Sequence, residues 1–444
     1  MTHQQFSLGV LANFGPPAWQ AATGRLHGGD WWTGEYFITL AQRLEAAGVD
    51  FLFFLDTLAV RRDADGDIDA AALASTVAAP SHDPLPLLAA IAAATKKIGL
   101  IGTASTSFYP PYTLARVLST LDSMSGGRIG WNVVNSFERS EAKNFGFDDL
   151  IDHGDRYERA EEYVELARKL WAAWDDDALV QNEATNTYVD ASRVHSVDHE
   201  GQYFRVQGPL NVLPSPQRFP VIAQAGASER GLAFAAKNAE LAFVLGGDGD
   251  SLDGAIEART QLRTRAAEFG RDPDSVKAVF PVNVVFLDRE WDPAEGIPAT
   301  DFQVEAAASW LSQSLDIDLL RYPMDEPFPL DVPPSGIRSM FSAFRALAEE
   351  GMPLRQAIVK TRYGGTGSTN FFGTPEQVAQ QMISFMDVVG GDAMMLSATM
   401  QFTAADLDAI TERLVPALRA AGVLRGDSVP EGATFRERLS GSAS

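Results

Sequence analysis

The sequence predicts an α/β fold built as a (β/α)8 TIM barrel with insertions. Short apolar runs alternate with amphipathic helical segments along the chain, which is the pattern of a parallel sheet with helices between its strands. Eight such strand segments can be recognised, and eight parallel strands close a barrel. A doubly wound open sheet is the alternative, but it seldom has this many regular units.

The predicted strands are short apolar runs bounded by turn residues. Asp50–Leu55 is the clearest, because its continuous apolar run is typical of a strand buried on both faces. The strand segments are, in order, Ser7–Ala12, Asp50–Leu55, Lys97–Gly102, Arg128–Val134, Pro220–Gln224, Leu241–Leu245, Val276–Leu287 and Asp392–Ser397.

The predicted helices follow these strands and repeat their apolar residues with helical spacing. They are Glu35–Ala47, Pro84–Ala94, Tyr112–Leu121, Arg156–Trp174, Glu229–Lys237, Leu252–Phe269, Pro375–Val388 and Ala404–Ala421. Residues 1–425 are therefore expected to form one barrel domain, followed by a loosely held C-terminal tail over 426–444. Insertions interrupt the alternation at about 57–83, 182–216 and 288–370, and the last is expected to act as a lid.

Composition excludes several classes of function. The net charge is −23, which disfavours binding to nucleic acid or to an anionic membrane surface. The chain has no cysteine, so disulfides, thiolate metal sites and cysteine nucleophiles are excluded. His195 and His199 lack the helix and the glutamate of a zinc motif, and no metal site is expected. No signal peptide or membrane span is recognisable, so a cytoplasmic protein is expected.

Ligands of a barrel bind where its strands end. Asp56 follows the second predicted strand, Thr103 the third, and Asn132 lies near the end of the fourth. Such small hydrogen-bonding residues suit a polar planar ligand better than hydrolytic chemistry. Asp56 is also consistent with a simpler role, in which its carboxylate accepts hydrogen bonds from nearby backbone N–H groups.

Two predicted helix starts are suited to an anion. His153 and Tyr157 are four residues apart and project from one helix face, and Ala227-Ser228 opens the next helix. Free N–H groups at a helix N-terminus favour phosphate. Taken alone, Ser228 is equally a helix cap and His153 a surface or capping histidine. Neither a GxSxG elbow nor a GxGxxG fingerprint after the first strand is present, so no nicotinamide site is expected.

The chain resembles the bacterial luciferase-like flavin monooxygenases from about Phe6 to about Val423. Within them it is similar to the group of nitrilotriacetate monooxygenase component A and dibenzothiophene sulfone monooxygenase. The order and spacing of several segments carry the resemblance, whereas no one segment is specific by itself. These segments are Phe51–Asp56, Tyr109–Tyr112 with Leu114–Arg116, Leu121–Ser136, Ala142–Gly146, Asp152–Tyr163, Leu170–Trp174, Gly208–Leu210, Pro220–Ser228 and Gly373–Gln377.

The resemblance implies a set of contacts to FMN. Asp56 and Thr103 would lie beside the isoalloxazine, with the register between Thr103 and Ala104 left open, and Asn132 would face the ring or the ribityl chain. The phosphate side would be held by His153, Tyr157, Ser228 and the backbone of Ala227. Asn135 departs from the threonine usual in this group, which leaves the local ring contact open.

The resemblance also implies the activity. Reduced FMN, supplied by a separate NAD(P)H-dependent flavin reductase, would react with O2 to a flavin peroxide that inserts one oxygen atom into a small organic substrate. Sulfones, thioethers, aromatic or heterocyclic compounds and aminopolycarboxylates are the substrate classes of the group. No general base is assigned, and His153 is only a weak candidate. A homodimer or homotetramer is expected. The alternatives are an F420-dependent oxidoreductase of the same fold and a non-catalytic flavin-binding paralogue.

Overall fold

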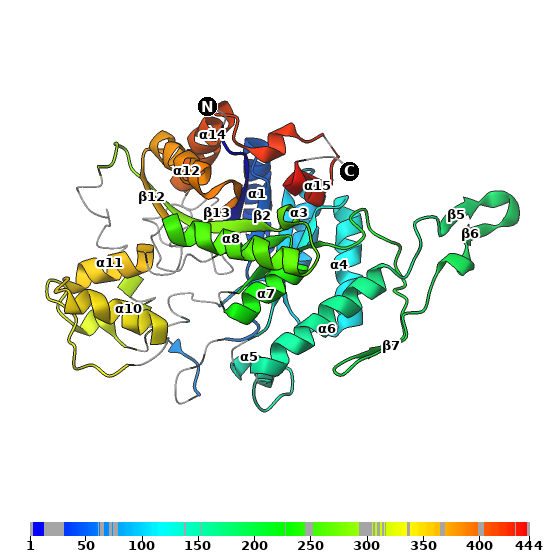
Figure 1. The fold of residues 1–444 in the computed structure, drawn as a ribbon, viewed down its shortest axis with the longest axis horizontal. Helices are drawn as coiled ribbons and strands as arrows, with labels where there is room; N and C mark the ends of the chain where they lie inside the picture. The colour runs from blue at the N-terminus through cyan, green and yellow to red at the C-terminus, as the bar shows by residue number, and fades with distance from the viewer. Residues whose placement is uncertain are drawn as a thin grey trace. The chain divides into compact units, whose positions relative to one another are not determined.

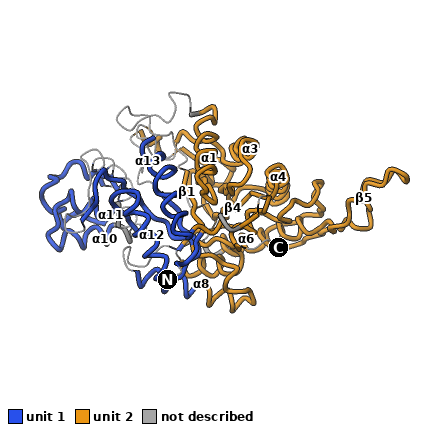
Figure 2. The backbone as a smooth tube through the Cα atoms, turned by 90° about the horizontal axis from the view of Figure 1, so that it is seen from above, with its two compact units in different colours: residues 1–6, 244–261, 279–423 blue, residues 7–243, 262–278, 424–444 orange. Residues whose placement is uncertain are grey.

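The computed structural model shows the chain as strands and helices in alternation (Figure 1). It describes residues 3–12, 31–60, 79–136, 139–151, 153–226, 228–244, 252–292, 317–334, 338–364, 369–397, 404–430 and 432–441, with single residues and short pieces between 62 and 73 and between 304 and 315. The chain divides into two compact units, coloured separately in Figure 2. One contains residues 7–243, 262–278 and 424–444, and the other contains residues 1–6, 244–261 and 279–423.

Eight parallel strands form a closed barrel, as the sequence predicts. In the order in which they pair around the barrel, they are β1 (Phe6–Ala12), β2 (Phe51–Phe54), β3 (Gly99–Ser105), β4 (Ile129–Val134), β9 (Val221–Ala225), β10 (Leu241–Phe243), β11 (Lys277–Phe286) and β13 (Asp392–Ser397). Pairing of β10 with β11 closes the ring. Each lies within one or two residues of its predicted segment, except that β3 runs on through Ser105, three residues further than predicted.

The predicted helices are also present. They are α1 (Glu35–Ala47), α3 (Pro84–Ala94), α4 (Pro111–Ser125), α6 (His153–Trp171), α7 (Glu229–Asn238), α8 (Leu252–Glu268) and α12 (Pro375–Val389). The last predicted helix is divided, because a π-helical turn at Ile410–Leu414 separates α13 (Ala404–Ala409) from α14 (Val415–Ala420). None of the helices that the structure describes is long and apolar enough to cross a bilayer.

Side chains alternate between the barrel interior and the helices, as expected for strands buried on both faces. The ring of Phe54 meets that of Phe37 on α1 with centroids 5.8 Å apart. Its neighbour Phe53 points the other way and meets Phe243 of β10 at 4.8 Å. A Cβ on Gly102 would lie 3.0 Å from Leu88 of α3, so Gly102 faces the helices and Thr103 faces the interior.

The insertion predicted at about 182–216 forms two antiparallel hairpins, the first of which begins at Leu179. The first pairs β5 (Leu179–Asn182) with β6 (Thr187–Val189), and the second pairs β7 (His199–Glu200) with β8 (Arg205–Val206). The β5–β6 hairpin extends away from α4 and α6 (Figure 1), and every residue of β5 is exposed. The side chain of Asn182 accepts a hydrogen bond from the N–H of Thr185, and this bond stabilises the turn of the first hairpin.

The large insertion at 288–370 contains a hydrophobic core of its own. Helices α10 (Arg338–Glu349) and α11 (Leu354–Gly364) pack together in it (Figure 1), and Phe328, Phe344 and Ile358 are among its fully or almost fully buried residues. At its end, the sequence analysis missed a strand. Residues Thr369–Gly373 form β12, which pairs in parallel with β11 from Val282 to Phe286, whereas no strand was predicted there.

The prediction of a loosely held C-terminal tail was wrong. Residues Phe435–Ser440 form helix α15, which begins with a capping box between Thr434 and Glu437. Phe435 is fully buried; its ring lies where a Cβ on Gly99 would intrude, and it is at contact distance from the Cβ position of Gly130. The tail therefore closes the end of the barrel at which β3 and β4 begin.

Candidate functional site

Trp131 of β4 packs against the helix layer. Its ring centroid lies 5.8 Å from that of Tyr163 and 6.4 Å from that of Trp171, and its indole N–H donates to the carbonyl of Ala104 at 3.0 Å. Because successive side chains of a strand alternate, its neighbour Asn132 faces the barrel interior.

Asn132 and Thr103 form a polar pair on that interior face. The Asn132 Nδ2 donates to Thr103 Oγ1 at 2.9 Å, and that hydroxyl donates to the carbonyl of Phe54 at 2.8 Å. Both residues are almost fully buried. Among the residues that the structure describes, Asn132 Oδ1 has no hydrogen-bond donor. Thr103 rather than Ala104 therefore shares a face with Asn132, and a buried acceptor there remains open to a ligand.

A second polar pair joins the last residue of β3 to the segment that follows β4. The hydroxyls of Ser105 and Ser136 are 2.9 Å apart and buried. Next to them, the Thr106 hydroxyl donates to Asn135 Oδ1 at 2.8 Å, so the asparagine that departs from the family pattern is tied to β3. The sequence analysis did not assign Ser105 or Ser136, although the two-residue spacing from Thr103 to Ser105 indicates the same face.

Tyr157 and Ser228 meet at the N-terminus of α7. The Tyr157 Oη lies 3.3 Å from Ser228 Oγ, and Ser228 also caps the helix by accepting from the N–H of Gly231 at 3.0 Å. Ser228 can therefore cap the helix and still have its hydroxyl beside that of Tyr157. Helix α6 begins at His153, but the side chain of His153 and the whole of Ala227 lie outside the described residues.

Glycines allow the backbone to come close at this helix start. A Cβ on Gly226 would lie 2.9 Å from the Cα of Gly231, and one on Gly231 would lie 3.0 Å from Tyr157 Oη. The adjacent Gln224 is buried, and its Oε1 has no donor within the described part of the chain. Two hydroxyls, helix N–H groups and a nearby open acceptor fit a ligand with a phosphate and hydroxyl groups, such as FMN.

Asp56 follows β2 in a half-buried position. Burial, together with the negative charges of Asp83 and Glu141, raises the pKa of its carboxyl group to about 7, although a hydrogen bond from the Thr57 backbone opposes this shift. Burial and the charges of Asp83 and Asp56 also raise the pKa of Tyr109. Near neutral pH, Asp56 can therefore both hold and release a proton.

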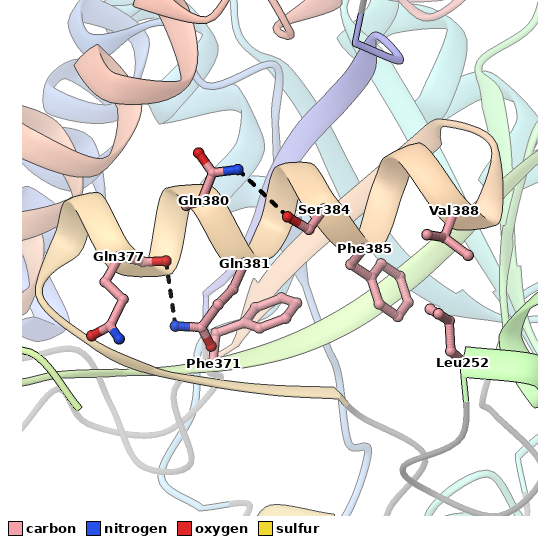
Figure 3. Close-up of a pocket in the computed structure, with 8 residues that line it drawn as sticks. All are labelled: Leu252, Phe371, Gln377, Gln380, Gln381, Ser384, Phe385 and Val388. Atoms are coloured by element: carbon pink, nitrogen blue, oxygen red, sulfur yellow. Dashed lines mark hydrogen bonds between the residues drawn. The ribbon is translucent and has the colours of Figure 1, made fainter. Parts of the chain in front are cut away.

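A separate pocket with a volume of about 470 Å³ lies in the unit that contains residues 279–423, and Figure 3 shows the residues that line it. Phe371 and Phe385 form part of its wall, and Gln377, Gln380 and Gln381 project from α12. Gln381 Nε2 donates to the carbonyl of Phe372 at 2.8 Å. Of the predicted site residues that the structure describes, none lines this pocket.

The two histidines of the insertion are bound to acidic residues. His195 Nε2 lies 3.0 Å from Asp175 Oδ1, and His199 Nε2 lies 3.1 Å from Glu162 Oε1. Glu162 also accepts from the backbone N–H groups of Tyr203 and Phe204. The contacts of Glu162 hold the second hairpin against α6.

A closed barrel with polar pairs at its strand ends and a glycine-rich helix start defines a TIM-barrel enzyme. A family model described as luciferase-like monooxygenase matches residues 7–391. The chain belongs to this family.

Named relatives confirm the predicted group. The chain is 35% identical to N-acetyl-S-(2-succino)cysteine monooxygenase of Bacillus subtilis, over 91% of the chain and 89% of that protein. It is 34% identical to dibenzothiophene-sulfone monooxygenase of Rhodococcus erythropolis, over 92% and 90%, and 32% identical to nitrilotriacetate monooxygenase component A of Aminobacter aminovorans, over 91% and 89%. The crystal structure of DmoA from Hyphomicrobium sulfonivorans superposes with a TM-score of 0.82 at 30% identity, covering 99% of this chain and 94% of that one.

Proposed function

We propose that the chain is the oxygenase of a two-component system, which uses FMNH2 and O2 to insert one oxygen atom into a small organic substrate. The observation that carries the proposal is the approach of Tyr157 Oη to Ser228 Oγ at 3.3 Å on the first turn of α7. A phosphate group placed there would receive two hydroxyl donors and the free N–H groups of the helix.

The polar pairs of β3 and β4 extend this site toward the flavin ring. Asn132 belongs to the strand that pairs with β9, and β9 leads directly to Ser228. A ligand held at Ser228 by its phosphate would therefore extend along the ends of β9, β4 and β3. Asn132 Oδ1 would accept a hydrogen bond from an N–H or O–H of the ligand, which satisfies its one open position.

The residues of the chain would bind and orient while the cofactor supplies the redox chemistry. Reduced FMN, when bound, provides the electrons that activate O2. Asp56, with its pKa raised to about 7, is suited to carry a proton near the ring at neutral pH. Buried aromatic residues such as Phe53 and Phe243 keep water from the interior below the polar pairs.

The reductant and the substrate come from outside the chain. We expect a separate NAD(P)H-dependent flavin reductase to deliver the reduced flavin, since no nicotinamide fingerprint follows β1. Sulfones, thioethers, aromatic or heterocyclic compounds and aminopolycarboxylates are the substrate classes to screen, because the named relatives act on a sulfone, a thioether-containing cysteine derivative and nitrilotriacetate.

Anaerobic titration with FMNH2, followed by mixing with O2 in a stopped-flow spectrometer, tests the proposal. We expect tight FMNH2 binding and an oxygen-dependent spectral intermediate, and then product formation in a screen with a generic reductase. Ser228→Ala and Tyr157→Phe should each weaken FMNH2 binding. Unchanged affinity in both variants would contradict the phosphate site, and tighter binding of F420 than of FMNH2 would favour the alternative cofactor.

A further inference from the structure

Arg230 lies beside the proposed phosphate site, although the sequence did not single it out. It is the second residue of α7, and the carbon of its guanidinium lies 5.9 Å from the centroid of the Tyr157 ring. Tyr157 in turn reaches Ser228 with its hydroxyl. A positive charge therefore lies beside the ring of the tyrosine whose hydroxyl would receive the phosphate.

The partner of Arg230 in the structure is weak. Arg230 Nη2 donates to Glu158 Oε1 at 3.4 Å, and the Tyr203 hydroxyl donates to the other oxygen of Glu158, also at 3.4 Å. The side chains of Arg230 and Glu158 are 46% and 54% exposed. Long, solvent-exposed ion pairs contribute little to stability, so the guanidinium is available to a stronger acceptor.

The surrounding negative charge favours such a cation. Asp155 and Glu158 lie in the first turns of α6, Glu229 opens α7, and the chain as a whole carries a charge of −23. Arg265 contacts Glu229 at 3.3 Å, which offsets one of these acids. A phosphate dianion entering this region is repelled unless a nearby cation compensates it.

Resting on the flavin function proposed above, we propose that Arg230 is the cationic ligand of the FMN phosphate and that Glu158 competes with the phosphate for its guanidinium. A guanidinium forms charge-assisted, often bidentate hydrogen bonds with a phosphate. The pair thereby selects a phosphorylated flavin over riboflavin, which offers Arg230 no anion. Glu158 keeps the guanidinium in place when no phosphate is present.

The test is equilibrium binding of FMN and of riboflavin, measured by flavin fluorescence and, for the reduced forms, by anaerobic titration. Lys237 and Glu161 provide a matched control, because they form a second ion pair between the same two helices at 2.6 Å with similar exposure of 44% and 42%. Lys237→Gln removes the same charge from α7 as Arg230→Gln does, but at the other end of the helix.

We expect Arg230→Gln to weaken FMN binding about tenfold while leaving riboflavin binding unchanged, as the loss of one charge-assisted contact predicts. Glu158→Gln should tighten FMN binding several-fold, since the competitor is lost while Arg230 stays in place. Lys237→Gln should change neither affinity. Circular dichroism of each variant confirms that its fold is retained.

Two results separate this inference from the proposed function. If the wild-type protein prefers FMN and Arg230→Gln and Glu158→Gln both retain the wild-type ratio of FMN to riboflavin affinity, the role of Arg230 is overturned and the flavin function stands. If the wild-type protein binds neither oxidised nor reduced FMN, the proposed function itself is overturned.

Discussion

The side chains of Thr103 and Asn132 join the third and fourth barrel strands through a hydrogen bond of 2.9 Å on the interior face. The Thr103 hydroxyl in turn donates a hydrogen bond to the carbonyl of Phe54 on the second strand. The chain of bonds fixes the Asn132 amide, so that its oxygen is the atom left open. Three neighbouring strands thus set the orientation of one proposed flavin contact.

Replacing Thr103 by valine should test this arrangement directly. The substitution keeps the shape of the side chain but removes the acceptor of Asn132 Nδ2, which then loses its partner in a buried position. We expect the free energy of unfolding in urea to fall by about 1–3 kcal/mol. Thr103→Ser retains the hydroxyl and should recover most of this loss. Wild-type stability of Thr103→Val would show that the bond does not contribute.

Asp56 should make stability depend on pH. Its carboxyl pKa is about 7 in the folded protein and near its ordinary value of about 3.9 in the unfolded chain. The folded state therefore favours the protonated form. The contribution of this carboxyl group to the free energy of unfolding is full below about pH 4 and is lost as the pH rises to about 7. Asp56→Asn has no such group, so its stability relative to the wild type should increase from pH 4 to pH 8.

Urea unfolding of both proteins across this range measures the difference. The charge of Asp83 raises the pKa of Asp56. In Asp83→Asn, made in the wild-type background, the decrease in stability caused by Asp56 should therefore occur at lower pH. The asparagine still caps α3 as Asp83 does through the N–H of Leu85. A difference between wild type and Asp56→Asn that is constant with pH would contradict the raised pKa.

Phe435 should be a major contributor to stability despite its place in the C-terminal tail. The side chain is fully buried, and its ring centroid lies 5.9 Å from that of Phe51. We expect Phe435→Ala to lower the free energy of unfolding by about 3–5 kcal/mol. Met124→Ala, at a side chain that is 65% exposed, should change it by less than about 0.5 kcal/mol. Equal effects of the two substitutions would refute the packing role of α15.

Gln377 should hold the segment after β11 onto α12. Its Oε1 accepts from the Trp291 N–H at 2.9 Å, and its Nε2 donates to the Trp291 carbonyl at 2.8 Å. Gln377→Ala should reduce the free energy of unfolding by about 1–3 kcal/mol, and Gln377→Glu should not restore it, because a carboxylate has no donor for the carbonyl. Gln380→Ala, on the exposed side of the same helix, serves as the control in urea or thermal unfolding.

Much of the barrel could be predicted because its strands and helices carry their own local signals. The apolar runs around Phe53 and Trp131 indicate the buried strands, and the helical spacing of apolar residues indicates the helices between them. β12 carries no such signal: Thr369 and Asn370 begin it, and it depends on pairing with β11. The burial of Phe435 likewise depends on contacts with Gly99 and Gly130, which are distant in sequence.

For the candidate site, the sequence identified residue types and positions but not their partners. Asn132 could be chosen from its place at a strand end, whereas the bond that leaves its Oδ1 open depends on the register of β3 against β4. Arg230 follows Ser228 by two residues, yet its relation to Tyr157 depends on how α7 packs against α6. Side-chain contacts between helices are set by tertiary packing, which single-sequence patterns do not contain.

The position of α15 has a consequence for biosynthesis. Gly99 and Gly130 emerge from the ribosome some 300 residues before Phe435, the ring that fills the space beside them. Before Phe435 is synthesised, the apolar side chains at this end of the first four strands are exposed to water. In that state the strands can associate with other nascent chains. The packing of the N-terminal half of the barrel is therefore completed only when α15 is present, so folding of this chain depends on late, long-range contacts.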